Sequence, residues 1–111
     1  MKADGTGKVR VATRIQKRIE QGTFDNQGCS HLSQIQEVVP SAEGCEDCLK
    51  IGDKWVHLRI CLTCGYVGCC DNSKNKHATR HHHATQHPVI ASFQRGEDWI
   101  WCYPDQQFFQ T

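Results

Sequence analysis

The sequence predicts a small α+β domain, in which an antiparallel sheet of about four to five short strands packs with one main helix. Apolar residues alternate over 55–60, which predicts a half-buried strand, and shorter apolar runs predict further strands at 66–67, 89–93 and 98–103. The main helix is expected at about residues 75–86. A chain of 111 residues buries only a modest core, so we expect an additional staple.

Local signals indicate where these elements begin and end. Asn72 or Ser73 is expected to cap the main helix, and Pro88 keeps the helix from continuing far. Glycines at 52 and 65 predict turns, the second at a point where the chain must reverse. Residues 33–39 predict a brief helix or strand that ends at Pro40.

Charge divides the chain into an extension, a body and a tail. Residues 1–24 carry six basic and two acidic side chains, whereas the remaining 87 residues carry seven basic and ten acidic ones. We therefore expect a basic N-terminal extension at 1–24, a domain at 25–106 and a C-terminal tail at 107–111. Apolar spacing over Val9–Gln21 favours a short amphipathic helix in the extension, and a short strand at Lys8–Ala12 is the alternative.

Cysteines and histidines are concentrated in the middle of the body. Residues 61–87 hold four of the eight cysteines and five of the seven histidines, a density typical of metal sites. No secretory leader is recognised at Met1, so we expect a reducing, cytoplasmic compartment. That compartment, the histidines and the two Cys-x-x-Cys pairs favour metal ligands over disulfides. No apolar run has transmembrane length, so no membrane association is expected.

Twelve side chains are candidate ligands, enough for three four-coordinate structural zinc sites. They are Cys29, His31, Cys45, Cys48, Cys61, Cys64, Cys69, Cys70, His77, His81, His87 and Cys102. Spacing alone does not assign the groups. His77 and His81 lie four residues apart on the predicted helix, as metalloprotease histidines do, but Ala78 stands where that motif needs glutamate, which disfavours hydrolysis.

The order of these residues resembles a known family. Cys-x-His, Cys-x-x-Cys, a tryptophan seven residues later, Cys-x-x-Cys-Gly-x-Val-x-Cys, His-x3-His-x5-His-Pro and a final Trp-Cys-Tyr follow one another over about residues 27–106. This pattern resembles the UBP-type (ubiquitin-specific-protease-type, or BUZ) zinc finger, in its free-standing small-protein version.

The resemblance implies interleaved zinc sites. The first implied set is Cys45, Cys48, Cys69 and His77, and the second is Cys61, Cys64, His81 and His87. A third implied set is Cys29, His31, Cys102 and Asp105, the last standing where the family has cysteine. Two alternatives stay open: counting back from His77 selects Cys70 in place of Cys69, and Asp105 is otherwise a surface residue beside a missing or water-completed third site.

The resemblance also implies a ligand. In the best-known members an aromatic slot clamps the C-terminal Gly-Gly of ubiquitin, and its positions here are Trp55, Trp101 and Tyr103. The family arginine that binds the terminal carboxylate is replaced by Asp71, so the pocket is expected to accept another chain terminus, an internal peptide or a ubiquitin-like partner. Arg59, Arg80 and Arg95 are the arginines considered as substitutes.

We therefore expect a monomeric zinc module that binds a protein or peptide C-terminus and is not an enzyme. One alternative is a zinc module without ubiquitin binding that acts as a peptide or nucleic-acid adaptor, although the acidity of the body disfavours nucleic acid. Another is a Cys-x-x-Cys redox protein. Redox pairs sit at a helix start in a thioredoxin-like βαβ pattern, which neither pair is expected to do.

Overall fold

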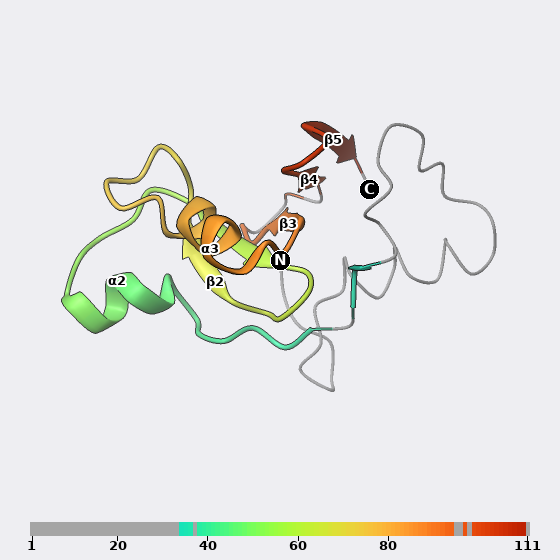
Figure 1. Ribbon diagram of the computed structural model, residues 1–111. Helices are drawn as coiled ribbons and strands as arrows, with labels where there is room; N and C mark the ends of the chain where they lie inside the picture. The colour runs from blue at the N-terminus through green and yellow to red at the C-terminus, as the bar shows by residue number, and fades with distance from the viewer. Residues whose placement is uncertain (1–33, 37, 95–96, 98, 111) are drawn as a thin grey trace.

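The computed structural model describes residues 34–36, 38–94, 97 and 99–110, which form one antiparallel sheet and two helices (Figure 1). The elements are α2 (Glu46–Ile51), β1 (Leu58–Cys61), β2 (Val67–Cys69), α3 (His77–Thr85), β3 (Val89–Ser92), β4 (Trp99–Cys102) and β5 (Gln107–Gln110). The strand order is β2-β1-β3-β4-β5, and every neighbouring pair is antiparallel. Helix α3 packs against β2 and β1, and α2 packs against β2, so both helices gather at one end of the sheet. The predicted α+β class is confirmed.

Three local predictions were wrong. Residues 107–110 are not a tail but the edge strand β5, which pairs with β4 along its full length. The described part of 33–39 forms neither strand nor α-helix, because its backbone bonds outward, as from Gln36 N–H to the carbonyl of Leu62 at 2.8 Å. The strand expected from residue 55 begins only at Leu58, and Val56 before it is 53% exposed.

The two faces of the sheet carry different side chains, as the period of two in a strand requires. One face belongs to the buried core, and its residues are Leu58, Ile60, Val89, Ala91, Ile100 and Cys102. On the alternate positions, Ile90 pairs with Trp101, and Trp101 pairs with Phe108 across three adjacent strands. A row of large side chains therefore crosses the second face, which is where the pocket described below lies.

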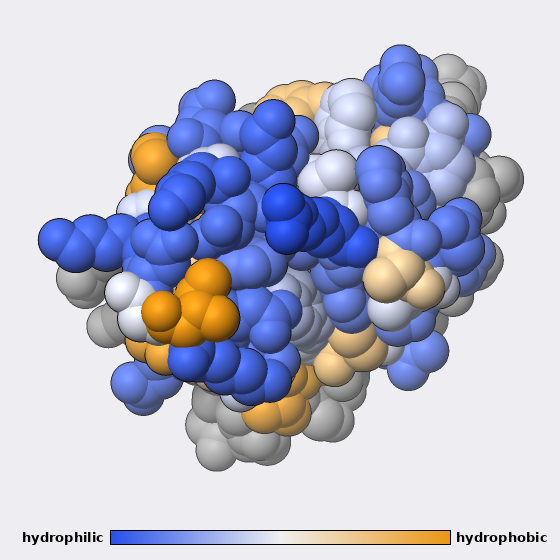
Figure 2. All heavy atoms as spheres, turned by 60° about the vertical axis from the view of Figure 1, so that its left-hand side comes forward, coloured by the Kyte–Doolittle hydropathy of each residue, from blue (hydrophilic) through white to orange (hydrophobic). Residues whose placement is uncertain are grey.

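The side of the molecule that carries α2 is mainly hydrophilic, with a few isolated hydrophobic spots (Figure 2). Leu49 and Ile51 on this helix are among the exposed large apolar residues. Scattered exposure of this kind is ordinary for a soluble domain. No described helix is long and apolar enough to cross a membrane.

Gly65 closes the turn between β1 and β2, as predicted. Its φ is +88°, its N–H donates to the carbonyl of Cys61 at 2.8 Å, and a Cβ at this position would collide with the carbonyl oxygen of Val39. Gly52, which ends α2 with φ +71°, has nothing within 4 Å of such a Cβ. The two glycines share a left-handed backbone but differ in the space around them.

We expect Gly65→Ala to destabilise the zinc-loaded domain by about 3 kcal/mol, because backbone strain and a backbone collision add. Gly52→Ala is the matched control and is expected to cost about 1 kcal/mol, since only the strain applies. Thermal unfolding at a fixed free zinc concentration measures both. Equal losses for the two variants would contradict the close approach of Val39 to Gly65.

The predicted extension at 1–24, with its expected helix, lies outside the described residues, as do Cys29, His31 and the candidate arginine Arg95.

Candidate metal centres and aromatic pocket

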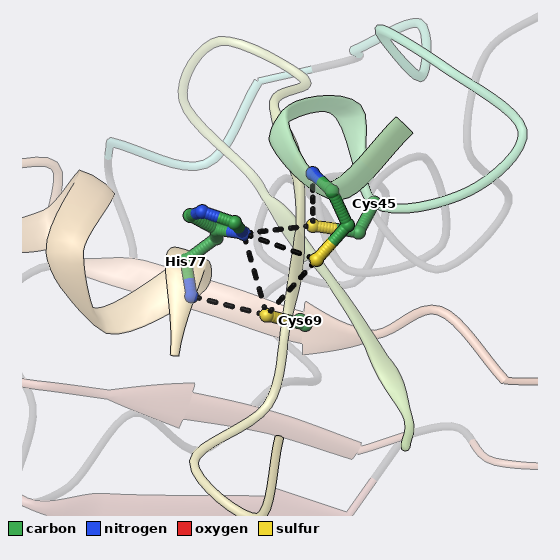
Figure 3. Close-up of side chains that lie close together, drawn as sticks. Cys45, Cys69 and His77 are labelled. Carbon is green, nitrogen blue, oxygen red and sulfur yellow. Dashed lines mark hydrogen bonds between the residues drawn. The ribbon is translucent and has the colours of Figure 1, made fainter. Parts of the chain in front are cut away.

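Four side chains from three separate elements converge beside the start of α3. Cys45 and Cys48 come from the start of α2, Cys69 ends β2 and His77 begins α3 (Figure 3). Their ligand atoms, the three Sγ and the His77 imidazole nitrogen, all lie within 4.8 Å of one another. The three cysteines are fully buried. We call this group cluster 1.

The spacing inside cluster 1 fits one tetrahedral zinc ion. Two thiolates at about 2.3 Å from such an ion lie about 3.8 Å apart, and a thiolate and an imidazole nitrogen lie about 3.6 Å apart. In the structure, Cys48 Sγ and Cys69 Sγ are 4.0 Å apart. His77 Nδ1 lies 3.2 Å, 3.3 Å and 3.5 Å from the sulfurs of Cys45, Cys48 and Cys69. These distances are those of ligands that surround a common centre.

A second group, cluster 2, consists of Cys61, Cys64, His81 and His87, whose ligand atoms also lie within 4.8 Å of one another. Cys61 Sγ is 3.4 Å from His87 Nδ1, and Cys64 Sγ is 3.3 Å from His81 Nε2. Burial and the neighbouring His87 lower the pKa of His81, which favours the neutral imidazole that zinc binds. None of the seven described cysteines forms a disulfide.

The two clusters are joined through α3 and Tyr66. His77 and His81 lie one turn apart on the helix, and each belongs to a different cluster. The ring of Tyr66 stacks on His81 with centroids 4.3 Å apart, and its hydroxyl donates to Asp47 of α2. Residues around one cluster therefore orient ligands of the other, which is the function of outer-shell contacts at metal sites.

Cysteine sulfurs accept backbone N–H groups at the starts of both helices. Cys45 is the N-cap of α2 and accepts from Cys48 N–H at 3.5 Å, and Cys69 Sγ accepts from His77 N–H at 3.2 Å. The expected cap of α3 at Asn72 or Ser73 was wrong, since Lys76 occupies the cap position without a side-chain bond. Thiolates suit helix N-termini because the unpaired N–H groups there favour negative charge.

Cys70 lies outside both clusters. Its sulfur contacts Ser73 Oγ at 3.6 Å, and the residue lines the pocket described below. Of the third implied set, the described pair is Cys102 and Asp105, whose Sγ and Oδ2 lie 3.9 Å apart, close enough for two ligands of one ion.

A pocket of about 270 Å³ lies on the second face of the sheet. Strands β1, β3, β4 and β5, the segment after β2 and the start of α3 contribute to its wall. The lining residues are Arg59, Cys70, Asp71, Asn72, Thr79, Ile90, Trp99, Trp101, Tyr103 and Phe108. Trp101 and Tyr103, expected from the sequence, are among them.

Trp55, also expected in the slot, does not line this pocket and instead packs against the hydrophobic core and over Gly44. Trp99 and Phe108 were missed as pocket residues. Their ring centroids are 5.5 Å apart, on neighbouring strands. Alternation along β4 places Trp99 on the same face as Trp101, and this signal was present in the sequence.

Of Arg59 and Arg80, the two candidate arginines that the structure describes, Arg59 of β1 lines the pocket. Its Cζ lies 4.5 Å from the centroid of the Trp99 ring, and Nη1 donates to its neighbour's carbonyl, Leu58 O, at 2.9 Å. Stacking on an aromatic face and one backbone hydrogen bond hold the guanidinium in place. Among the described residues it makes no other hydrogen bond, so its other N–H groups can donate to a ligand.

Residues 45–111 match the family model described as "Zn-finger in ubiquitin-hydrolases and other protein". The chain belongs to this zinc-finger family. The UBP-type zinc finger is a zinc-binding module, in agreement with the two Cys/His clusters. The match extends through β5, whereas the sequence pattern alone ended at about residue 106.

The chain is similar to segments of two much longer proteins and to one solved structure of comparable length. The chain is 31% identical over 80 residues to Histone deacetylase 6 of Caenorhabditis elegans, covering 68% of this chain and 8% of that protein. It is 30% identical over 73 residues to Ubiquitin carboxyl-terminal hydrolase 14 of Schizosaccharomyces pombe, covering 60% of this chain and 9% of that protein. The chain thus spans less than a tenth of these relatives. The solution NMR structure of protein RPA1320 from Rhodopseudomonas palustris is 59% identical, with a TM-score of 0.71 over 78% of this chain and 84% of the other.

Zinc binding at clusters 1 and 2 is expected to release about five protons at pH 7, one for each thiol of the two clusters, and an ion at the third implied set would release two more. Burial is the main cause that raises the pKa of Cys45 to about 12 and of Cys61 to about 11 in the folded chain. An unfolded thiol has a pKa of about 8.5, so these groups are protonated at pH 7 in either state. Because the metal-free chain is expected to be unfolded, zinc affinity should rise with pH up to about 8.5, the pKa of an unfolded thiol, and fall in acid. Calorimetry in two buffers of different ionisation enthalpy counts the protons. A count near zero would contradict thiolate ligation.

Proposed function

We propose that this chain is a zinc-stabilised protein-interaction module that binds the free C-terminus of a protein or peptide in the aromatic pocket. The observation that carries the proposal is the position of Arg59, held against Trp99 at the wall of that pocket. A guanidinium pairs with a carboxylate through two parallel N–H groups, and stacking on the ring holds it in place for such a pair.

In this proposal Arg59 binds the terminal carboxylate, the role that the family gives to an arginine at the position of Asp71. Both residues line the pocket, so the loss of arginine after β2 does not leave the pocket without a cation. The aromatic side chains beside it suit a narrow, extended peptide end, since rings pack against backbone without requiring a side chain. Ubiquitin and ubiquitin-like proteins are the partners that the family suggests.

In this proposal the metal is structural and the module is not catalytic. Clusters 1 and 2 each supply four protein ligands and hold one zinc ion, which leaves no open coordination position for a substrate. Cys102 and Asp105, with Cys29 and His31, hold a third ion. We propose that the chain acts as a monomer in the cytoplasm.

One observation in the structure favours the alternative of a redox Cys-x-x-Cys pair, and another argues against it. Cys45-x-x-Cys48 does lie at a helix start, contrary to the sequence-based expectation. Both thiols, however, lie in a four-ligand cluster with Cys69 and His77, and a bound zinc ion leaves neither free for thiol exchange.

Calorimetric titration with free ubiquitin, and with ubiquitin lacking its last two glycines, tests recognition of a chain end. We expect binding of the intact form only, and about tenfold weaker binding in the Arg59→Gln variant, because one charged hydrogen-bonded pair is lost. Arg80→Gln is the matched control, since Arg80 is exposed on α3 and does not line the pocket. Equal binding of the two ubiquitin forms would rule out recognition of the tail, and an equal loss in both arginine variants would rule out Arg59 as its partner.

A further inference from the structure

The pocket carries two opposite charges that the described protein leaves unpaired. Arg59 and Asp71 both line it. Within residues 34–36, 38–94, 97 and 99–110, the ion pairs lie elsewhere, on α2 and between Lys74 and Asp53. Both pocket charges are therefore available to a ligand. A ligand that carries one negative and one positive group can pair with Arg59 and Asp71 together.

A directed chain of hydrogen bonds orients the acidic end of the pocket. Thr79 Oγ1 donates its single hydrogen to Asp71 Oδ1 at 2.6 Å. The Tyr103 hydroxyl, 3.3 Å from Thr79 Oγ1, must therefore be the donor in that contact. Burial raises the pKa of Tyr103 to about 12, and Asp71 adds to the shift, so the hydroxyl keeps its proton.

The direction of these hydrogen bonds determines which kind of ligand group can bind at the acidic end of the pocket. The hydroxyl hydrogen of Tyr103 points toward Thr79, and that of Thr79 points toward Asp71. Only the oxygen lone pairs of these two hydroxyls therefore remain for a ligand. A carboxylate placed there finds no donor in the Thr79 and Tyr103 hydroxyls and meets the like charge of Asp71. An ammonium or guanidinium finds acceptors and a carboxylate.

The wall between the two charges is aromatic. Trp101 lies in the middle strand of the row formed with Ile90 and Phe108, and Tyr103 is held from behind by His82, stacked at 4.2 Å and 8°. Aromatic faces attract cations and also pack against the methylene stem of a long basic side chain. A volume of about 270 Å³ suits one or two residues of a chain end and not a folded element.

We propose that the pocket selects a chain end whose last residue is lysine or arginine. The α-carboxylate pairs with Arg59, the side-chain stem lies along Trp101 and Tyr103, and the cation reaches Asp71. The inference rests on the proposed function, because it uses the same contact between Arg59 and a carboxylate. A Gly-Gly end satisfies Arg59 but leaves Asp71 without a partner.

The test is calorimetric titration of the zinc-loaded protein with four peptides of the form Ser-Gly-Gly-X. Their ends are lysine as the free acid, lysine as the amide, norleucine as the free acid and glycine as the free acid. Norleucine is the matched control, since it keeps the stem of lysine and removes its charge. We expect the lysine acid to bind about tenfold more tightly than the norleucine acid, a ratio typical of one partly exposed charge pair. Ubiquitin should rank with the glycine peptide.

Variants locate the effect. Asp71→Asn keeps an acceptor oxygen for Thr79 and removes the charge, so it should abolish the preference for lysine and leave norleucine binding unchanged. Glu43→Gln, an exposed acid outside the pocket, should preserve the preference. Zinc content and circular dichroism report whether each variant is folded.

The outcomes separate the two proposals. Equal affinity for the lysine and norleucine acids, in the unaltered protein, overturns the preference for a basic end and leaves recognition of a free C-terminus standing. A lysine amide that binds as well as the lysine acid, or no binding by any of the acids, overturns the proposed function itself. Retention of the lysine preference in Asp71→Asn assigns the cation to another group and overturns the role of Asp71.

Discussion

Removal of zinc with excess chelator is expected to unfold the domain, with loss of its far-ultraviolet circular dichroism signal. A structural zinc ion contributes on the order of 10 kcal/mol to folding, and a whole domain is stable by only about 5–15 kcal/mol. Both helices begin at cluster 1, and α3 carries one ligand of each cluster, so removing the ions releases α2, α3 and the turns together.

Two controls make this expectation sharp. Chelator saturated with zinc beforehand should leave the spectrum unchanged, and zinc added after chelation should restore it. A spectrum that survives chelation, with zinc loss verified by mass spectrometry, would show that the sheet core folds without metal. The buried residues Ile60, Val67 and Ile100 would then have to supply the stability by themselves.

Cys69→Ser and Cys70→Ser are expected to differ by several kcal/mol although the positions are adjacent. Cys69 Sγ lies in cluster 1 and accepts the first N–H of α3, so its loss should cost one zinc ion and the start of the helix. Cys70 lies outside both clusters, with its sulfur 3.6 Å from Ser73 Oγ, and serine there should cost about 1 kcal/mol.

Native mass spectrometry counts the ions in each variant, and thermal unfolding ranks their stability. We expect one zinc ion fewer in Cys69→Ser and an unchanged count in Cys70→Ser. The reverse pattern would assign Cys70 as the ligand, which is the alternative that counting back from His77 in the sequence leaves open.

Features with a repeating pattern could be predicted from the sequence. The alternation around Leu58 and Ile60 located β1 from Leu58 onward. The helix expected at about residues 75–86, before Pro88, begins two residues later at His77. The structure brings together the same two sets of four residues that the family resemblance implies. Resemblance was needed for that grouping, because spacing alone leaves many ways to divide twelve ligands.

Features that depend on tertiary contacts could not be predicted in this way. The expected cap of α3 was wrong because Cys69 Sγ, held in cluster 1, accepts the first N–H of the helix, the bond that an asparagine or serine side chain usually makes. Strand β5 was missed because Gln107-Phe-Phe-Gln is too short to show an alternating pattern and gains its order from pairing with β4.

The pocket combines residues that could be predicted from the sequence with residues that could not. Trp101 and Tyr103 followed from their positions in the motif, but Trp55 did not, because the chain after α2 turns its ring over Gly44. Arg59 could be placed only as one of three arginines. The pairing of β1 with β3 and of β3 with β4 brings it beside Trp99, and no local pattern contains that information.

The tryptophans allow the most direct test of pocket binding. Trp99 and Trp101 line the pocket and Trp55 does not, so a bound chain end should shift two of the three indole N–H signals in an NMR spectrum. With a peptide that has a free C-terminus, we expect the signals of Trp99 and Trp101 to move and saturate together while that of Trp55 stays in place. A shift confined to Trp55, or no shift in any of the three at millimolar peptide, would contradict binding of a chain end at this pocket.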